Sequence, residues 1–247
     1  MMDAVAPMSL ADTMSAGLVT ALRSKQYAFV PGRSLQAACG LEPEVWAEFA
    51  DCWERLTLDH YMGDGGRYRY RRYGAFLLGA HGELVLQPHG PYEQPRYINT
   101  LNGGVARHFD PLEPSFVHNR FLRGLLRALG RAFDAAEGTN APWLVRLHPY
   151  RIRADGAMLG QPTPEGLHRD GVDFICTLMV ERHNVEGGET RITDAAGNLL
   201  HALTLSDPLD LLVANDVTTM HGVSPITAAR PDRAAWRDVL VIAYARP

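Results

Sequence analysis

The sequence predicts a mainly β protein of the α+β class, with a β-barrel or jelly roll at its centre and helices packed outside it. Two observations support this class. From residue 143 onward, short apolar segments alternate with turn signals such as "EGG", "AAGN" and "SDP", a spacing typical of sandwiches and barrels. Before residue 143, longer segments carry apolar residues at helical spacing. The chain of 247 residues shows no internal repeat or obvious linker, so we expect one domain over residues 1–247.

Residues 1–62 are expected to form a helical N-terminal part. Residues 9–24 have helical spacing, and "YAFVPG" after them indicates a short strand that ends in a turn. Residues 42–61 place apolar side chains on one face of a helix, at Val45, Trp46, Phe49, Trp53 and Leu56. Pro43 suits the first turn of that helix, because an N–H at this position has no intrahelical partner.

The jelly-roll core is expected over residues 63–247. Its first elements are "RYRYRRYGAFLLG" and "ELVLQP", joined by "AHG", which together indicate a hairpin. An inserted helix at about 115–138 follows, with Ser115 as its N-cap and Gly138 as its stop. The remaining predicted strands cover 143–153, 173–180, 189–193, 199–205, 209–213, 217–221 and 238–244.

The composition argues against several classes of partner. Charged residues are 21% of the chain and the formal net charge is −4, so neither nucleic acid nor an acidic membrane is expected to bind. No apolar run approaches the roughly 20 residues of a membrane span, and the N-terminal segment lacks the basic start of a signal peptide. The three cysteines form no C-x-x-C pair, which fits the reducing cytoplasm. The expected partner is a small-molecule substrate.

The stretch "GLHRDGVDF", residues 166–174, indicates a metal site. His168 and Asp170 lie two positions apart, so in extended backbone their side chains point the same way. "NDVTTMHGVSPI" places His221 at the end of a later strand. Two imidazoles and one carboxylate form the facial triad of non-haem Fe(II) oxygenases. A structural zinc site would usually show cysteines, and common catalytic motifs such as G-x-S-x-G and H-E-x-x-H are absent.

An Fe(II) oxygenase also needs a source of electrons, which a 2-oxo acid can supply while it is decarboxylated. The far carboxylate of that acid needs a cation, and the planar fork of arginine suits it better than lysine. Arg237 lies sixteen residues after His221 and opens the last predicted strand, "RDVLVIAYA". Arg230 and Arg233 are near, but they lie in a predicted loop. We therefore expect Arg237 to bind the 2-oxo acid.

The residues alone leave two alternatives open. In one, His108 and Asp110 supply the H-x-D pair, with His168 as the distal ligand and Arg182 as the anchor. Pro111 follows Asp110 directly, which argues against a core strand there. In the other, no metal binds, because histidine and aspartate are common at strand ends.

Several polar residues are candidates for substrate contacts. Glu165 precedes the expected triad and could line the pocket or orient His168. Arg107 could bind a substrate carboxylate, as could Arg71 or Arg153, and Asn99 could make a polar contact. A surface position or an internal salt bridge is the alternative for each arginine.

The C-terminal half resembles a known enzyme family. The stretches that carry the resemblance are "PTPEGLHRDGVDF", "VERHNVEGGETRI", "LSDPLDLLVANDV", "MHGVSPI" and "WRDVLVIAYA". They are similar to the bacterial 2-oxoglutarate/Fe(II) dioxygenases that include L-isoleucine 4-hydroxylase, and to the biofilm-stress proteins of the BsmA type. The resemblance covers roughly residues 67–245.

This resemblance implies a double-stranded β-helix, or jelly-roll, fold with flanking helices. It implies iron ligands at His168, Asp170 and His221, and a 2-oxoglutarate carboxylate on Arg237. The "ARHFDPLEP" stretch matches a part of the family that is not used as the triad. The implied reaction consumes O2 and 2-oxoglutarate, releases succinate and CO2, and hydroxylates a C–H bond.

The expected function is therefore an Fe(II)- and 2-oxoglutarate-dependent dioxygenase that hydroxylates a small polar substrate, a free L-amino acid or a derivative. The alternative is a stress or biofilm regulatory protein that binds the metal and 2-oxoglutarate without efficient catalysis. A third reading is a metal-dependent, cupin-like isomerase or lyase that works without O2.

Overall fold

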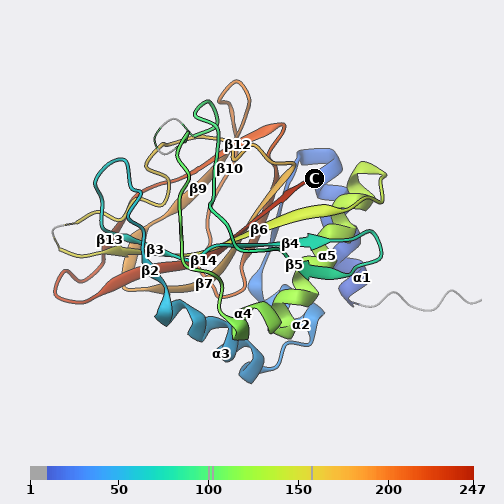
Figure 1. Cartoon of the computed structure of the whole chain (residues 1–247), viewed down its shortest axis with the longest axis horizontal. Helices are drawn as coiled ribbons and strands as arrows, with labels where there is room; N and C mark the ends of the chain where they lie inside the picture. The colour runs from blue at the N-terminus through green and yellow to red at the C-terminus, as the bar shows by residue number, and fades with distance from the viewer. Residues whose placement is uncertain (1–9, 100, 102, 157) are drawn as a thin grey trace, which may run out of the picture.

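A large antiparallel sheet forms the centre of the computed structural model, which describes residues 10–99, 101, 103–156 and 158–247. Helices lie on one side of this sheet and two smaller sheets lie on the other (Figure 1). This is the jelly roll with outer helices that the sequence predicts. Residue 9, the first residue of the predicted helix 9–24, lies outside the described residues.

The main sheet has the strand order β1-β11-β7-β14-β6-β3-β2, with β4 and β5 extending it beside β6. Its strands are β1 (Tyr27–Val30), β2 (Thr57–Leu58), β3 (Arg69–Arg71), β4 (Gly74–Leu78), β5 (Leu84–Leu86), β6 (Trp143–Ala154), β7 (Phe174–His183), β11 (Leu211–Asn215) and β14 (Ala235–Ala245). The long strands β6, β14 and β7 are neighbours, so the last strand of the chain lies between two earlier ones.

Two smaller sheets complete the jelly roll. One has the order β10-β9-β12, with β10 (Leu199–Thr204), β9 (Glu189–Asp194) and β12 (Thr219–Val223), and the other pairs β13 (Ile226–Ala228) with β8 (Val185–Gly187). Each of the seven strands predicted from residue 143 onward has a counterpart in the structure, either in the main sheet or in a smaller one. The short strands β8 and β13 were not predicted, because three residues give too little pattern to recognise.

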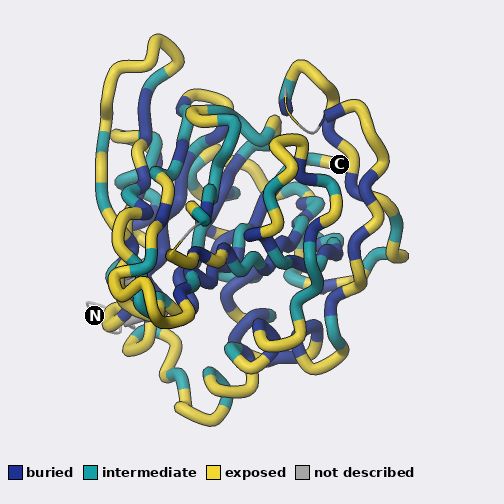
Figure 2. Tube along the Cα trace, turned by 90° about the vertical axis from the view of Figure 1, so that its left-hand side faces the viewer, coloured by how far each residue is buried: buried dark blue, intermediate teal, exposed yellow. Residues whose placement is uncertain are grey.

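The helices cover the outer face of the main sheet. They are α1 (Leu10–Lys25), α2 (Gly32–Cys39), α3 (Pro43–Asp51), the 3-10 helix η1 (Cys52–Arg55), α4 (Pro114–His118) and α5 (Arg120–Glu137). In the described part of the chain, no helix has both the length and the apolar character that crossing a membrane requires. Figure 2 shows the buried segments gathered in the middle of the molecule, with exposed loops around them.

Alternation along the central strands separates two apolar cores. In β7, Cys176 and Leu178 pack with the helices, whereas Ile175 and Met179 point to the interior between the sheets. Side chains of a strand alternate between its two faces, so one strand serves both cores. The helices therefore support the sheet from outside and leave the inner face free to carry a pocket.

Three predicted elements differ from the structure. The helix predicted over 42–61 ends earlier, because α3 gives way to η1 and then to β2, which pairs with β3. The helix predicted over 115–138 is two helices, and the N-cap of the longer one is Asn119, whose Oδ1 accepts from the N–H groups of Phe121 and Leu122. Ser115 instead lies inside α4. The stretch "RYRYRRYGAFLLG" is also two strands, β3 and β4, which pair with successive parts of β6.

Candidate metal centre and its pocket

The predicted site residues come together in one pocket on the inner face of the main sheet. Its floor is formed by the central strands β6, β7 and β14, and its rim by residues from 92–99, by Arg107 and by residues from 162–170. The predicted residues that line it are Asn99, Arg107, Glu165, His168, Asp170, His221 and Arg237. Arg71 and Arg153, the other two candidates for a substrate carboxylate, are not among its lining residues.

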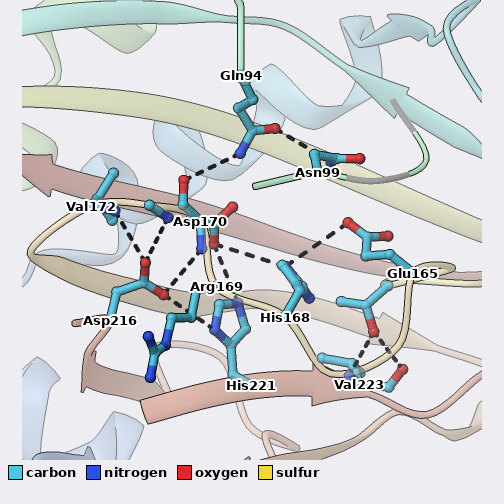
Figure 3. A network of polar contacts seen from close by, with 12 residues as sticks. Gln94, Asn99, Glu165, His168, Arg169, Asp170, Val172, Asp216, His221 and Val223 are labelled. Carbon is cyan, nitrogen blue, oxygen red and sulfur yellow. Dashed lines mark hydrogen bonds and ion pairs between the residues drawn. The ribbon is translucent and has the colours of Figure 1, made fainter. Parts of the chain in front are cut away.

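His168, Asp170 and His221 offer three ligand atoms that lie within 4.8 Å of one another. The Nε2 atom of His221 is 3.3 Å from Oδ2 of Asp170, and the Nε2 atom of His168 is 4.0 Å from the same oxygen. Figure 3 shows the three side chains converging from two segments of the chain. Among the described residues, no other group of histidine, cysteine and acidic side chains meets this condition.

Backbone pairing sets the two histidines opposite each other. The N–H of His168 donates to the carbonyl of His221 at 2.9 Å, and the N–H of His221 donates back at 2.9 Å. This two-way bridge joins the loop before β7 to β12. The carbonyl of Gly166 lies 3.0 Å from Nδ1 of His168, and because a carbonyl can only accept, Nδ1 carries the proton. Nε2 of His168 is then left with a lone pair that faces the site.

A buried carboxylate holds the turn that follows Asp170. Asp216, just before β12, accepts hydrogen bonds from the backbone N–H groups of Asp170, Gly171 and Val172 at 3.2, 2.8 and 3.1 Å. Gly171 has φ 76°, a backbone conformation that favours glycine. The side chain of Gln94 donates to the carbonyl of Asp170 at 3.3 Å from the other side. The backbone on both sides of Asp170 is thus held in place by these hydrogen bonds.

The electrostatics of the triad follow from these contacts. Burial raises the pKa of Asp170, but the hydrogen bond and charge of His221 and the charge of His168 outweigh it and hold the pKa well below its ordinary value. Burial lowers the pKa of His221, but Asp170 and Asp216 outweigh burial and raise it. A carboxylate that stays ionised beside two imidazoles is a donor set that suits a divalent cation.

Arg237 enters the pocket from β14 with another arginine beside it. Arg237 lies on the same face of β14 as Val239 and Val241, by the ordinary alternation of a strand. Its paired residue on β7 is Arg182, and an extra residue in β7 shifts the register between these strands next to the pair. Arg237 is 2% exposed, and its Nε and Nη2 atoms have no hydrogen-bond partner. Burial and then the charge of Arg182 lower the pKa of Arg237 to about 9. A buried guanidinium in this state needs an anion.

The alternative triad is not assembled. His108 and Asp110 are exposed in a loop, and they belong to no group of ligand atoms that could hold a metal in the described chain. Arg182, the anchor proposed with them, instead lies beside Arg237. Phe109 between them is buried against the guanidinium of Arg71, so this stretch contributes to packing.

Family comparison agrees with this geometry. A model of the 2OG-Fe dioxygenase family matches residues 50–243. The chain belongs to the 2OG-Fe dioxygenase family. It is therefore an oxidoreductase whose cofactors are iron(II) and 2-oxoglutarate, as the sequence resemblance implied.

Individual relatives extend this comparison. The dioxygenase is 26% identical over 235 residues to 3(1)-hydroxy-L-isoleucine 4-dioxygenase of Pantoea ananatis (strain AJ13355), covering 91% of this chain and 94% of that protein. It is 24% identical over 202 residues to L-isoleucine-4-hydroxylase of Bacillus thuringiensis, covering 77% and 81%. The crystal structure of a BsmA homolog from Methylobium petroleophilum PM1 has a TM-score of 0.85 and 33% identity, covering 100% of this chain and 96% of that one.

The residues of the dioxygenase fit both cofactors. The three converging nitrogen and oxygen atoms suit ferrous iron, because one face of the ion would remain open for substrates. The unpartnered nitrogens of Arg237 suit the far carboxylate of 2-oxoglutarate. Thr177 and Val239 line the same pocket as Arg237.

Three residues that shape the pocket were not predicted from the sequence. Gln94 and Asp216 hold the backbone around Asp170, and His148 lines the pocket from β6. Burial and the charge of Arg71 lower the pKa of His148 well below its ordinary value, so His148 is neutral and its Nδ1 accepts from Arg71. The only sequence signal for Asp216 is its place in "NDV", just before the strand that ends with His221.

Proposed function

We propose that this dioxygenase hydroxylates a free L-amino acid or a close derivative, with iron held by His168, Asp170 and His221. In this proposal Arg237 binds the far carboxylate of 2-oxoglutarate. The observation that carries the proposal is the shared pocket. The triad and Arg237 come from three separate segments, yet all four side chains line one cavity on the inner face of the sheet.

The protein's own contribution is to hold and orient the reactants. When bound, iron and 2-oxoglutarate supply with O2 the oxidising power that converts a C–H bond to C–OH and releases succinate and CO2. Asp216 and the backbone bridge between the two histidines fix the ligand positions. The strands around Arg237 keep water away from the cofactor's carboxylate, which strengthens the ion pair.

The substrate class rests on the relatives and on the pocket. Two relatives that match most of the chain are named for the oxidation of isoleucine or hydroxyisoleucine. The pocket also contains charged side chains beyond those assigned to the cofactors, which suits a small polar molecule. We further propose a cytoplasmic location, since the three cysteines are free thiols, and no partnership with nucleic acid or membrane, since the net charge is −4.

An anaerobic titration tests the cofactor assignment. Fe(II) is added to metal-free protein, followed by 2-oxoglutarate, and the visible charge-transfer band of the chelated complex is recorded. We expect His221→Ala to abolish the band. Arg237→Ala should weaken 2-oxoglutarate binding by about thirtyfold or more, the usual loss when one partner of a buried charge pair is removed. His81→Ala and Arg153→Ala are matched controls, because both residues are exposed.

The outcomes separate the alternatives. A band that both site variants weaken, followed by product formation with free amino acids under O2, supports the hydroxylase. A band without any coupled product across the twenty common amino acids favours a binding protein without efficient catalysis. Fe(II) binding without a band contradicts the 2-oxoglutarate assignment and favours a metal-dependent enzyme that works without O2.

A further inference from the structure

The charged residues that line the pocket can be sorted by their partners. They are Arg69, Arg107, Glu165, Asp170 and Arg237. Arg69 is already paired, since its guanidinium lies 2.8 Å from Oδ2 of Asp59. Asp170 and Arg237 are assigned to iron and 2-oxoglutarate under the proposed function, on which this inference rests. Two charged side chains of opposite sign remain, Arg107 and Glu165.

Arg107 is a buried cation without an anion. It is 2% exposed, and its Nη2 atom donates to the neutral amide oxygen of Gln94 at 2.9 Å. The guanidinium carbon lies 4.7 Å from the ring centre of Tyr92, and Nε has no hydrogen-bond partner. No ion pair to Arg107 is present in the described part of the chain. Burying a guanidinium in this way is unfavourable unless a carboxylate joins it.

Glu165 is the matching acidic group. Its side chain is 11% exposed and its Oε2 atom is buried without a hydrogen-bond partner. The Nε2 atom of His168 lies 3.9 Å from Oε1 of Glu165, too far for a hydrogen bond. Figure 3 shows Glu165 beside His168 at the side of the triad. A hydrogen-bond donor is therefore missing at Glu165.

We infer that Arg107 and Glu165 form a subsite for the charged head of a free α-amino acid, with Arg107 on the carboxylate and Glu165 on the ammonium group. The charges of iron(II), Asp170, the 2-oxoglutarate dianion and Arg237 cancel. The charged lining left over is one cation and one anion, and an amino-acid zwitterion is its complement. A residue inside a peptide has neither charge and leaves both groups buried and unpaired, so the substrate is a free amino acid.

Arg107 also reaches the metal side of the pocket through one intermediate. Gln94 accepts from Arg107 with its oxygen and donates with its nitrogen to the carbonyl of Asp170. Asn99 donates to the same oxygen of Gln94 at 3.4 Å. The carboxylate subsite is thus tied to the loop that holds Asp170, and Glu165 belongs to the same loop. The head of the amino acid is positioned relative to iron by these connections.

The experiment measures anaerobic binding to protein loaded with Fe(II) and 2-oxoglutarate. L-Isoleucine, its N-acetyl derivative and its carboxamide are titrated while the charge-transfer band and the heat of binding are followed. The wild-type protein should bind both derivatives at least about tenfold more weakly than the free amino acid, because each derivative leaves one buried charge of the protein without its partner. If another of the twenty common L-amino acids binds more tightly, its own two derivatives are used.

Variants assign the two ends. Arg107→Met should weaken binding of the free amino acid about tenfold and leave the carboxamide unaffected. Glu165→Gln should also weaken binding of the free amino acid about tenfold, and it should leave the affinity for the N-acetyl derivative unchanged. Neither change should alter the affinity for 2-oxoglutarate measured without amino acid. Arg153→Met and Glu186→Gln are matched controls on exposed residues.

Three results would overturn the subsite while the proposed cofactor chemistry stands. The first is wild-type protein that binds a derivative as tightly as the free amino acid, a result that needs no variant to fold. The second is loss of 2-oxoglutarate affinity in Arg107→Met, which would make Arg107 part of the cofactor site. The third is an intact band with no binding by any of the twenty amino acids. Loss of the band in wild-type protein contradicts the proposed function itself.

Discussion

At the scale of single residues, Arg237 is the proposed anchor of 2-oxoglutarate. It is a large, fully buried side chain near the start of the long strand β14, where an apolar residue would pack without cost. Its pKa is lowered by burial and by Arg182, so the protein without cofactor holds an unfavourable buried charge. Binding sites commonly carry such a cost, because the group that destabilises the empty protein is the one that recognises the ligand.

Replacement of Arg237 should therefore separate stability from binding. We expect Arg237→Met to leave the melting temperature of the cofactor-free protein unchanged or raised, because the buried charge is gone. 2-Oxoglutarate at about 100 times its Kd should stabilise metal-loaded wild-type protein by roughly 2.7 kcal/mol and the variant by much less. Thermal unfolding with and without 2-oxoglutarate measures both. Arg191→Met, on the exposed side of β9, is the control, and a variant that keeps the full shift would contradict the assignment.

The sequence predicts the triad better than it predicts the residues around it. His168, Asp170 and His221 could be recognised because their residue types and their places at strand ends fit a known ligand set. Gln94 and Asp216 act on the Asp170 loop across sequence separations of 76 and 46 residues. Each is an ordinary polar residue whose role appears only when the fold brings its segment to the loop. Arg182 was considered only as the anchor of the alternative triad, and its place beside Arg237 depends on strand pairing between β7 and β14 that the sequence does not reveal.

At the scale of loops and strand ends, backbone contacts position the proposed metal ligands. Asp216 accepts three N–H groups of the turn after Asp170. Asp216→Asn replaces one acceptor oxygen with an N–H donor that faces those amides. We expect Fe(II) affinity to fall by roughly 10- to 100-fold, the usual effect of removing a group that orients a metal ligand. Anaerobic metal titration measures the change.

Asp194→Asn is the matched control for this effect. Asp194 also accepts backbone N–H groups of a turn, those of Ala196 and Asn198, but in the β9–β10 connection and outside the pocket. The control should lose stability and keep its metal affinity. Equal losses of metal affinity in the two variants would mean that Asp216 acts through general stability.

Helix ends illustrate why some boundaries could not be predicted. The pattern over 115–138 is continuous on one face, so it predicts one helix with Ser115 as its cap. The structure begins α5 at Arg120 instead, because Asn119 caps it and its side-chain nitrogen also donates to the carbonyl of Val45 at 3.1 Å. That second bond joins α5 to α3, a contact that no local pattern records.

The cap can be tested by substitution. Asn119→Ala should lower the free energy of unfolding by about 1–2 kcal/mol, through loss of a buried N-cap. Ser115→Ala should cost less than about 0.5 kcal/mol, the usual range for changes away from such features. Denaturant unfolding of both variants provides the comparison. A larger loss of unfolding free energy for Ser115→Ala than for Asn119→Ala would contradict the assignment of Asn119 as the cap and favour Ser115, as the sequence predicts.

At the scale of the whole molecule, the main sheet has the helices on one face and the candidate pocket on the other. The fold class could be predicted because alternating short strands and amphipathic helices are local patterns. The strand order could not, since β14 lies between β6 and β7 through pairings that span the C-terminal half of the chain. That order makes β14 a central strand, and because side chains alternate along it, Leu240 points toward the helices and Val239 toward the pocket.

This division predicts different effects for the two faces. Leu126 of α5 is fully buried in the outer core, so Leu126→Ala should lower the free energy of unfolding by about 2–5 kcal/mol. At a temperature where the variant is folded, its Kd for 2-oxoglutarate should stay within about twofold of wild type, since distant sites act independently. Val239→Ala removes less volume but opens the pocket wall beside Arg237, so it should alter 2-oxoglutarate binding more than Leu126→Ala does. Chemical unfolding and the anaerobic titration, run on both variants, measure the two effects. If Leu126→Ala weakens 2-oxoglutarate binding as much as Val239→Ala, the helical layer positions the cofactor as well as supporting the sheet, and the two faces are coupled.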